Sequence, residues 1–113
     1  MSNIKLFYAV VVDLFFIGKI TSFAKSVGSK VVFLDSYEHL IEAIDDKMPE
    51  AVLVDLNGPL TVAHLDHIKS RYNVKMIGYL PHVQAELKQR AEKVCDRVMT
   101  QGEFSNNLVS ILG

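Results

Sequence analysis

The chain has 113 residues, 50% hydrophobic and 22% charged, with a formal net charge of −1. This length suits one domain with its own core, and the composition excludes a disordered chain. A balanced charge argues against a nucleic-acid binder, which needs a basic excess. Cys95 is the one cysteine and has no partner for an internal disulfide, so we expect a cytoplasmic, reducing location. No apolar run approaches the roughly 20 residues that span a bilayer, so we expect no membrane association.

Five stretches rich in β-branched and aromatic residues alternate with stretches of helical periodicity. The predicted strands cover residues 4–12, 30–34, 51–55, 74–80 and 97–99. The predicted helices cover residues 14–27, 37–48, 61–72 and 81–94, with about two further turns at the C-terminal end. Ser36 is placed to cap the start of the second helix and Gly28 to end the first. We expect the strands at 30–34 and 51–55 to be buried and the helical apolar stripes to include Met48 and Val83.

This alternation predicts one α/β domain over residues 1–113, a three-layer α/β/α sandwich around a five-stranded parallel sheet. Right-handed crossovers leave few ways to wind such a sheet, and the flavodoxin-like (CheY-like) strand order 2-1-3-4-5 fits best. In that order the switch point lies between the first and third strands, which lead into Asp13 and Asp55. We therefore expect these two carboxylates at one site.

The run 51–55 is the most informative stretch, because four apolar residues end on an acid. Asn57, Gly58 and Pro59 follow almost at once, as expected for a buried strand of a parallel sheet entering a turn. An acid in this place has two interpretations. Asp55 is either a functional group at the carboxyl end of the sheet or a cap for the loop amides of Asn57 and Gly58.

Over essentially its whole length the chain resembles the receiver domain of two-component response regulators. In that family an acidic pair follows the first strand, and the aspartate ending the third strand accepts a phosphoryl group with a bound Mg²⁺. The resemblance makes Asp55, with Pro59 four residues on, the phosphoacceptor-like residue. Asp13 matches one member of the acidic pair, so Asp13 and Asp55 are the candidate Mg²⁺ ligands. We expect no other cofactor.

Three features depart from the family pattern. Leu14 follows Asp13 where the second carboxylate is expected, and the fourth strand ends in residues 78–82 without a Thr or Ser. Thr100 and Gln101 stand near the end of the fifth strand, where the family has a lysine. Because phosphoryl transfer depends on positive charge near the phosphoryl oxygens, we predict a pseudo-receiver. Its predicted switch-point pocket is lined by Asp13, Leu14, Asn57, Tyr79, His82, Thr100 and Gln101.

Other candidate residues have simpler interpretations. His64 and His67 lie three apart on a predicted helix without an obvious third metal ligand, so we expect a solvated helix surface. Cys95 is expected to be a small, partly buried apolar group. No serine, histidine and acid are spaced for nucleophilic catalysis, so we expect no enzyme.

The functional hypothesis is a stand-alone, phosphorylation-independent signalling module that binds another signalling protein. The resemblance further implies a homodimer through the fourth helix, fifth strand and fifth helix. Two alternatives stay open. One is a phosphoacceptor modified at Asp55 with Mg²⁺, and the other is a small-ligand sensor that uses Asp13, Asp55 and His82.

Overall fold

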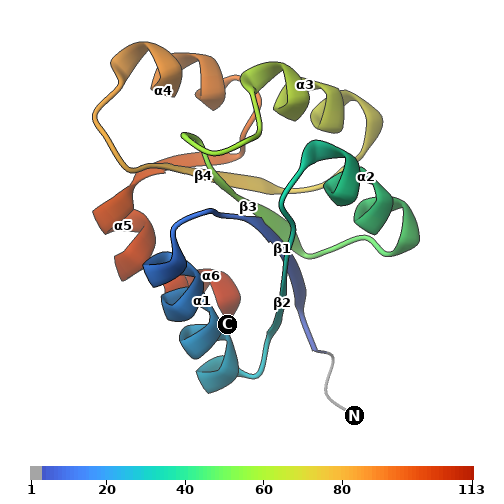
Figure 1. Cartoon of the computed structure of the whole chain (residues 1–113), viewed down its shortest axis with the longest axis vertical. Helices are drawn as coiled ribbons and strands as arrows, with labels where there is room; N and C mark the ends of the chain where they lie inside the picture. The colour runs from blue at the N-terminus through green and yellow to red at the C-terminus, as the bar shows by residue number, and fades with distance from the viewer. Residues whose placement is uncertain (1–3) are drawn as a thin grey trace.

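Five parallel strands form a single sheet in the order β2-β1-β3-β4-β5, which confirms the predicted topology. The computed structural model describes residues 4–113 (Figure 1). The strands are β1 (Leu6–Val10), β2 (Lys30–Phe33), β3 (Ala51–Asp55), β4 (Met76–Leu80) and β5 (Arg97–Thr100). The helices are α1 (Leu14–Val27), α2 (Tyr37–Asp46), α3 (Val62–Arg71), α4 (Ala85–Glu92), α5 (Gln101–Asn106) and α6 (Leu108–Leu112).

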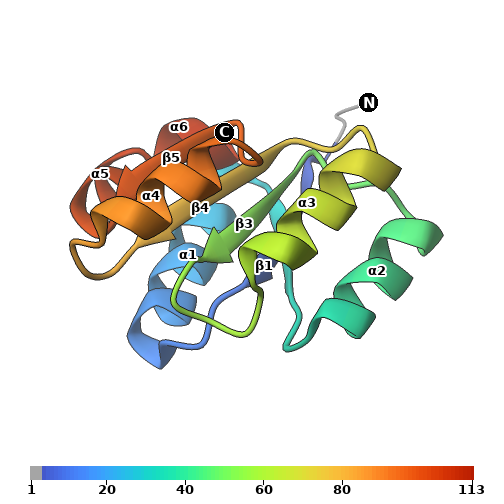
Figure 2. The same ribbon diagram turned by 90° about the horizontal axis from the view of Figure 1, so that it is seen from above.

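Helices cover both faces of the sheet and complete the three layers. Figures 1 and 2 show α1, α5 and α6 on one face and α2, α3 and α4 on the other. Side chains alternate between the faces along each strand. In β3, Leu53 belongs to the core under α1, α5 and α6, whereas Val52 and Val54 belong to the core under α2, α3 and α4. The strand therefore has no solvent-facing side, and all five of its residues are buried.

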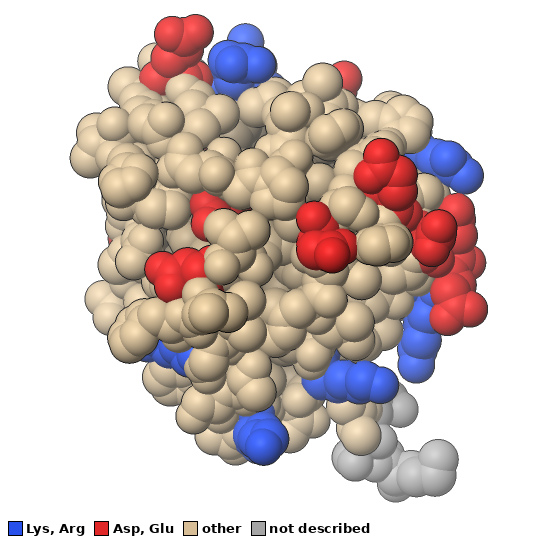
Figure 3. All heavy atoms as spheres, in the orientation of Figure 1, with Lys and Arg blue, Asp and Glu red and all other residues tan. Residues whose placement is uncertain are grey.

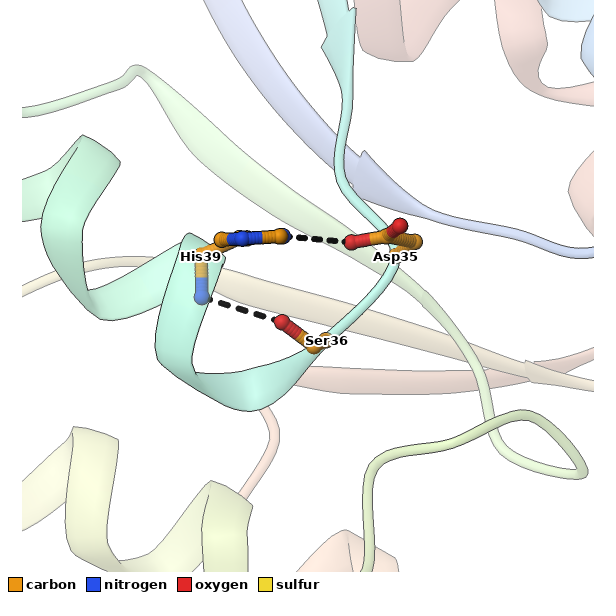
Figure 4. A network of polar contacts seen from close by, with 3 residues as sticks. All are labelled: Asp35, Ser36 and His39. Carbon is orange, nitrogen blue, oxygen red and sulfur yellow. Dashed lines mark hydrogen bonds and ion pairs between the residues drawn. The ribbon is translucent and has the colours of Figure 1, made fainter.

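Helix ends are fixed by local capping interactions. Gly28 ends α1 with φ 76°, a left-handed conformation that favours glycine. Ser36 begins α2, and its hydroxyl accepts the His39 amide at 3.1 Å, as predicted (Figure 4). The same turn holds an exposed ion pair between His39 Nδ1 and Asp35 Oδ1 at 2.6 Å. The hydrogen bond to Asp35 raises the pKa of His39.

Two burial predictions were wrong because they depended on tertiary contacts. Residues 30–33 form an edge strand, exposed at Lys30 and only partly covered over the rest of its length. Met48 lies beyond α2 with 48% of its surface exposed. The helix ends at Asp46, and the Tyr8 hydroxyl lies 3.0 Å from the Ala43 carbonyl and 2.7 Å from the Lys47 carbonyl.

Two predicted helices also differ from the structure. Residues 81–84 form a loop rather than the first turn of α4, so Val83 is 98% exposed instead of facing the core. The chain needs this loop to pass from the end of β4 to the helical layer. The C-terminal helix is interrupted at Asn107, whose side chain donates to the Glu103 carbonyl at 2.7 Å. Within residues 4–113, no helix combines the length and apolar character needed to cross a bilayer.

Two glycines provide a matched test of the packing. A Cβ at Gly78 in β4 would lie 3.0 Å from three side-chain carbons of Leu56, whereas one at Gly18 in α1 would meet nothing within 4 Å. We expect Gly78→Ala to lower the free energy of unfolding by about 1–3 kcal/mol through overpacking. Gly18→Ala should raise it by about 0.5–1 kcal/mol, because alanine loses less entropy in a helix. Urea unfolding measures the free energy of unfolding of both variants. If the two substitutions changed it equally and in the same direction, the close packing of Leu56 against Gly78 would be contradicted.

Candidate functional site

Asp55 is the last residue of β3 and is only 3% exposed. In the β3–β4 register it lies opposite Tyr79, and strand alternation places it on the same face as Leu53, toward α1. Its Oδ1 accepts the backbone amide of Asn57 at 2.8 Å. The carboxylate therefore does cap one loop amide. The Gly58 amide donates instead to the backbone carbonyl of Asp55, at 2.9 Å.

The electrostatic surroundings of Asp55 disfavour its ionised form. Burial raises its pKa, the hydrogen bond from Asn57 opposes that rise, and the negative charge of Asp13 adds to it. His82 acts in the opposite direction and lowers the pKa. The structure thus brings Asp13, Asp55 and His82 within electrostatic reach of one another, although they come from three separate loops or strand ends.

Asp13 is exposed and caps the start of α1, where its Oδ1 accepts the amide of Phe15 at 2.9 Å. Leu14 and Phe15 point away from the core, with 82% and 75% of their surface exposed, and Phe16 is buried. Leu14 therefore lies in solvent beside Asp13, and its place in the lining of a switch-point pocket stays a prediction. Phe16 begins the buried helical stripe and so turns the two preceding side chains into solvent.

Tyr79 is buried on the α1 face, in an aromatic cluster that no sequence pattern indicated. Its ring stacks on Phe16 at 5.0 Å and on Phe104 of α5 at 4.5 Å between ring centroids. Its hydroxyl is buried and has no hydrogen-bond partner within residues 4–113. Burial strongly raises the pKa of Tyr79, and the charges of Asp55 and Asp13 raise it further. The phenol therefore stays protonated and lies within electrostatic reach of both acids.

The remaining predicted residues have local roles. The Asn57 side chain donates to Gln84 Oε1 at 2.6 Å and ties the β3–α3 loop to the β4–α4 loop. Gln84 was not predicted, and no sequence pattern identified it. Thr100 caps α5, and its hydroxyl accepts the Glu103 amide at 3.1 Å. Gln101 is the first residue of α5 and is partly buried.

Few side chains at this site could bind a metal ion. The part of the chain that the structure describes has no group of three or more His, Cys, Asp or Glu side chains that could hold an ion. Mg²⁺ is usually bound by one or two carboxylates with water and phosphate oxygens. Asp13 and Asp55 meet only that minimum, so water or a phosphoryl group would have to supply the other ligands.

His67 is exposed on the surface of α3, as predicted, whereas His64 is partly buried. The His64 ring stacks on Tyr37 of α2 at 4.4 Å, and its Nδ1 accepts the Thr61 amide at 3.1 Å. His67 Nδ1 contacts the Tyr37 hydroxyl. These side chains join α2 to α3. Cys95 is 7% exposed, and burial raises its pKa to about 11, as expected for an unreactive thiol.

Comparisons with known proteins identify the fold. No protein-family model and no curated protein sequence matches the chain. Among solved structures, the chemotaxis response regulator CheY4 of Vibrio cholerae matches with a TM-score of 0.80 and 13% identity, over 97% of each chain. The phosphorylated cyanobacterial phytochrome response regulator RcpA matches with a TM-score of 0.78 and 16% identity, over 97% of this chain and 89% of that one.

A longer protein contains the same fold. NtrX from Brucella abortus matches with a TM-score of 0.78 and 16% identity, over 96% of this chain. The chain spans about a quarter of NtrX, because the match covers 26% of that protein. At such low identity the similarity shows the fold alone. This chain has the receiver fold of response regulators.

Replacing Tyr79 by phenylalanine tests the unpartnered hydroxyl. We expect Tyr79→Phe to raise the free energy of unfolding by about 1 kcal/mol, since it removes a buried polar group that makes no hydrogen bond within the described residues. The aromatic stack with Phe16 and Phe104 is retained. Urea unfolding measures the change, and a less stable variant would show that the hydroxyl has a partner in solution.

Replacing Asp55 by asparagine tests the raised pKa. A carboxyl with a higher pKa in the folded state stabilises the fold in acid, and this contribution disappears as pH rises through the folded pKa. We therefore expect Asp55→Asn to be more stable than the wild type at pH 7, and the difference to shrink toward pH 4. The side-chain carbonyl of the introduced asparagine can still accept the Asn57 amide.

The measurement is urea unfolding between pH 4 and 8. Asp66→Asn, on the exposed surface of α3, is the control for losing one negative charge. A variant at position 55 that loses stability at pH 7 would show that the ionised carboxylate is favoured in the folded protein.

Proposed function

We propose that this protein is a non-enzymatic signalling module with the receiver fold that binds another signalling protein without phosphorylation of Asp55. The observation that carries the proposal is the end of β5, where Thr100 and Gln101 stand in place of the lysine that the resemblance implies. The charged groups that shift the pKa of Asp55 include the acid Asp13 and the imidazole of His82. A phosphoryl group would add negative charge beside Asp13, where phosphoryl transfer needs positive charge.

The side chains around Asp55 support the same function. Leu14 lies in solvent and supplies no oxygen ligand beside Asp13. The hydroxyl of Thr100 is already engaged in capping α5. The ring of Tyr79 packs against both Phe16 and Phe104, and these two rings also contact each other. Thr100 and Tyr79 would each have to give up one of these interactions to respond to a phosphoryl group at Asp55.

A homodimer would use the edge formed by α4, β5 and α5. β5 is the last strand of the sheet, so one side of its backbone has no strand partner within the described residues. A groove of about 330 Å³ lies along it, lined by acidic and basic side chains that include Glu92, Arg97 and Glu103. Such mixed charge suits self-association, because a two-fold axis can place opposite charges together.

The first alternative is a phosphoacceptor modified on Asp55. The proximity of Asp13 to Asp55 favours it, and RcpA is a phosphorylated response regulator with this fold. In this case Asp13 and Asp55 would hold Mg²⁺, which would neutralise charge on the phosphoryl oxygens. Asp55 Oδ2 would be the attacking atom, because Oδ1 accepts the Asn57 amide.

The second alternative is a small-ligand sensor at the same edge of the sheet. In this case Asp13, Asp55 and His82 would hold the ligand. A groove of about 400 Å³ between the β3–α3 loop and α4 is lined by Asn57, Thr61 and Arg90 but by none of these three residues. A ligand specific to the folded state must raise the melting temperature. A thermal-shift screen with nucleotides and metabolites therefore tests this alternative.

Nuclear magnetic resonance separates binding from phosphorylation. Beryllofluoride mimics an acyl phosphate when it binds an aspartate with Mg²⁺. We expect the amide signals of Asp13, Asp55 and Asn57 to stay unchanged when both reagents are added, because Thr100 and Gln101 stand at the end of β5 in place of the lysine that the resemblance implies. The Asp55→Asn variant is the control for effects of the reagents elsewhere.

Saturable shifts at these amides that disappear in Asp55→Asn would overturn the proposal. The protein would then be a phosphoacceptor. Sedimentation equilibrium of the same sample measures the proposed homodimer, and a monomer at all concentrations would remove that part of the proposal.

A further inference from the structure

Three basic side chains line a small cavity at the edge of the sheet where the strands begin. Lys5 and Lys75 directly precede β1 and β4, and Arg97 is the first residue of β5. All three line one cavity of about 200 Å³, which we call the amino-edge cavity. Because the strands are parallel, this edge is opposite to the one at which Asp55 ends β3.

The alternation of side chains along the strands brings the three cations to one face of the sheet. Phe7 of β1 and Ile77 of β4 belong to the core under α1, α5 and α6. Lys5 and Lys75 each precede one of these residues by two positions, so they lie on the same face. Arg97 lies opposite Ile77 in the β4–β5 register. Cations from three separate strands therefore converge on the side of the sheet that α6 covers.

The surroundings of these cations are partly apolar. Phe7 and Ile77 are buried residues of the cavity lining, and Ser110 of α6 lines it as well. The Lys5 ammonium donates to the Gly113 carbonyl at 2.6 Å, which holds this lysine at the end of α6. Charges that lie above buried apolar groups are screened less than charges surrounded by water.

The amino-edge cavity has an excess of positive charge. Glu50 is the acid among its described lining residues, so three cations stand against one carboxylate. None of the three cations forms an ion pair with a carboxylate within residues 4–113. Figure 3 shows that, on the face in view, most Lys and Arg side chains stand apart from one another. Three cations at one cavity are therefore a local feature and not the general character of the surface.

These features select a small, doubly charged oxyanion. The cavity is smaller than the roughly 300–1,000 Å³ of sites that enclose a drug-sized ligand, so it suits a single charged group. A phosphate group carries enough oxygens to contact cations from three strands at once, whereas a carboxylate has only two. The guanidinium of Arg97 can pair with a phosphate through two parallel hydrogen bonds, and a lysine binds it as a point charge.

We propose that the amino-edge cavity binds the phosphate group of a small molecule, with Lys75 and Arg97 at its oxygens and Lys5 adding positive charge. Glu50 opposes the bound phosphate and so lowers its affinity. Ser110 supplies a hydroxyl that can donate to an oxygen of the ligand. This inference goes beyond the proposed function and does not depend on it, because the two sites lie at opposite edges of the sheet.

Titration of the whole protein with inorganic phosphate, followed by nuclear magnetic resonance, tests the inference. Sodium chloride is adjusted to keep the ionic strength constant, because salt screens exposed charges. We expect saturable shifts of the amide signals of Lys75, Ile77 and Ser110, with a Kd in the millimolar range. The amide signals of Asp13 and Asp55, at the other edge, should not change.

Single substitutions give effects of opposite sign. We expect Lys75→Gln and Arg97→Gln each to weaken phosphate binding by about threefold or more, since each removes one charge contact. Glu50→Gln should strengthen it by about the same factor, a gain that a misfolded variant cannot give. Lys88→Gln and Arg90→Gln are the matched controls, because both residues are exposed on α4, which covers the other face of the sheet (Figure 2). Their affinity should equal that of the wild type.

Three results would overturn the inference. These are shifts that do not saturate, equal affinity in the wild type and both cavity variants, or an equal loss in the α4 controls, since each would show an adventitious ion only. A thermal-shift comparison then tests the ligand class. We expect phosphate monoesters to raise the melting temperature more than succinate at the same concentration. A larger rise with succinate would remove the assignment to phosphate.

Discussion

The complete burial of β3 sets the chemistry of the whole carboxyl edge of the sheet. Helices cover this strand on both faces, so its last residue, Asp55, is held out of water. A buried carboxylate needs a hydrogen bond or an opposite charge. The backbone amide of Asn57 and the imidazole of His82 favour its ionised form, whereas the neighbouring acid Asp13 makes its ionisation harder. Because these interactions do not fully offset the cost of burial, the pKa of Asp55 is raised.

The fold and the individual residues at its switch point give different information about function. The fold places Asp13 and Asp55 together, as a phosphoacceptor site requires. Of the other predicted site residues, Tyr79 packs in an aromatic cluster and Thr100 caps a helix. A fold can keep its core while the functions attached to its loops change. A binding role for this edge is consistent with both observations.

The loops at this edge are connected to one another more closely than their sequences indicate. Asn57 and Gln84 join two loops directly. Phe16, Tyr79 and Phe104 join α1, β4 and α5 in a single stack beneath them. Asp13 precedes this stack closely in the chain, and its position is fixed because it caps α1. The residues Leu14 and Phe15, which follow Asp13 in the chain, are exposed to solvent.

Local patterns in the sequence were enough to predict the order of the elements, the strand order of the sheet and the place of Asp55. A four-residue apolar run ending on an acid is enough to locate β3, and the alternation of strands and helices restricts the topology. Capping residues such as Ser36 and Gly28 act through neighbouring backbone groups, so they too could be predicted. These features depend on interactions within or between adjacent elements.

The tertiary structure alone determined which of the predicted residues contact one another. Periodicity indicates that one side of a segment is apolar, but it does not say which neighbour covers that side. Residues 30–33 were predicted to be fully buried and lie at the edge of the sheet, and Val83 was assigned to a helix but lies in an exposed loop. The orientation of Tyr79 depends on Phe16 and Phe104, which are distant in sequence. Contacts of this kind arise from the packing of all three layers at once, and no local pattern encodes them.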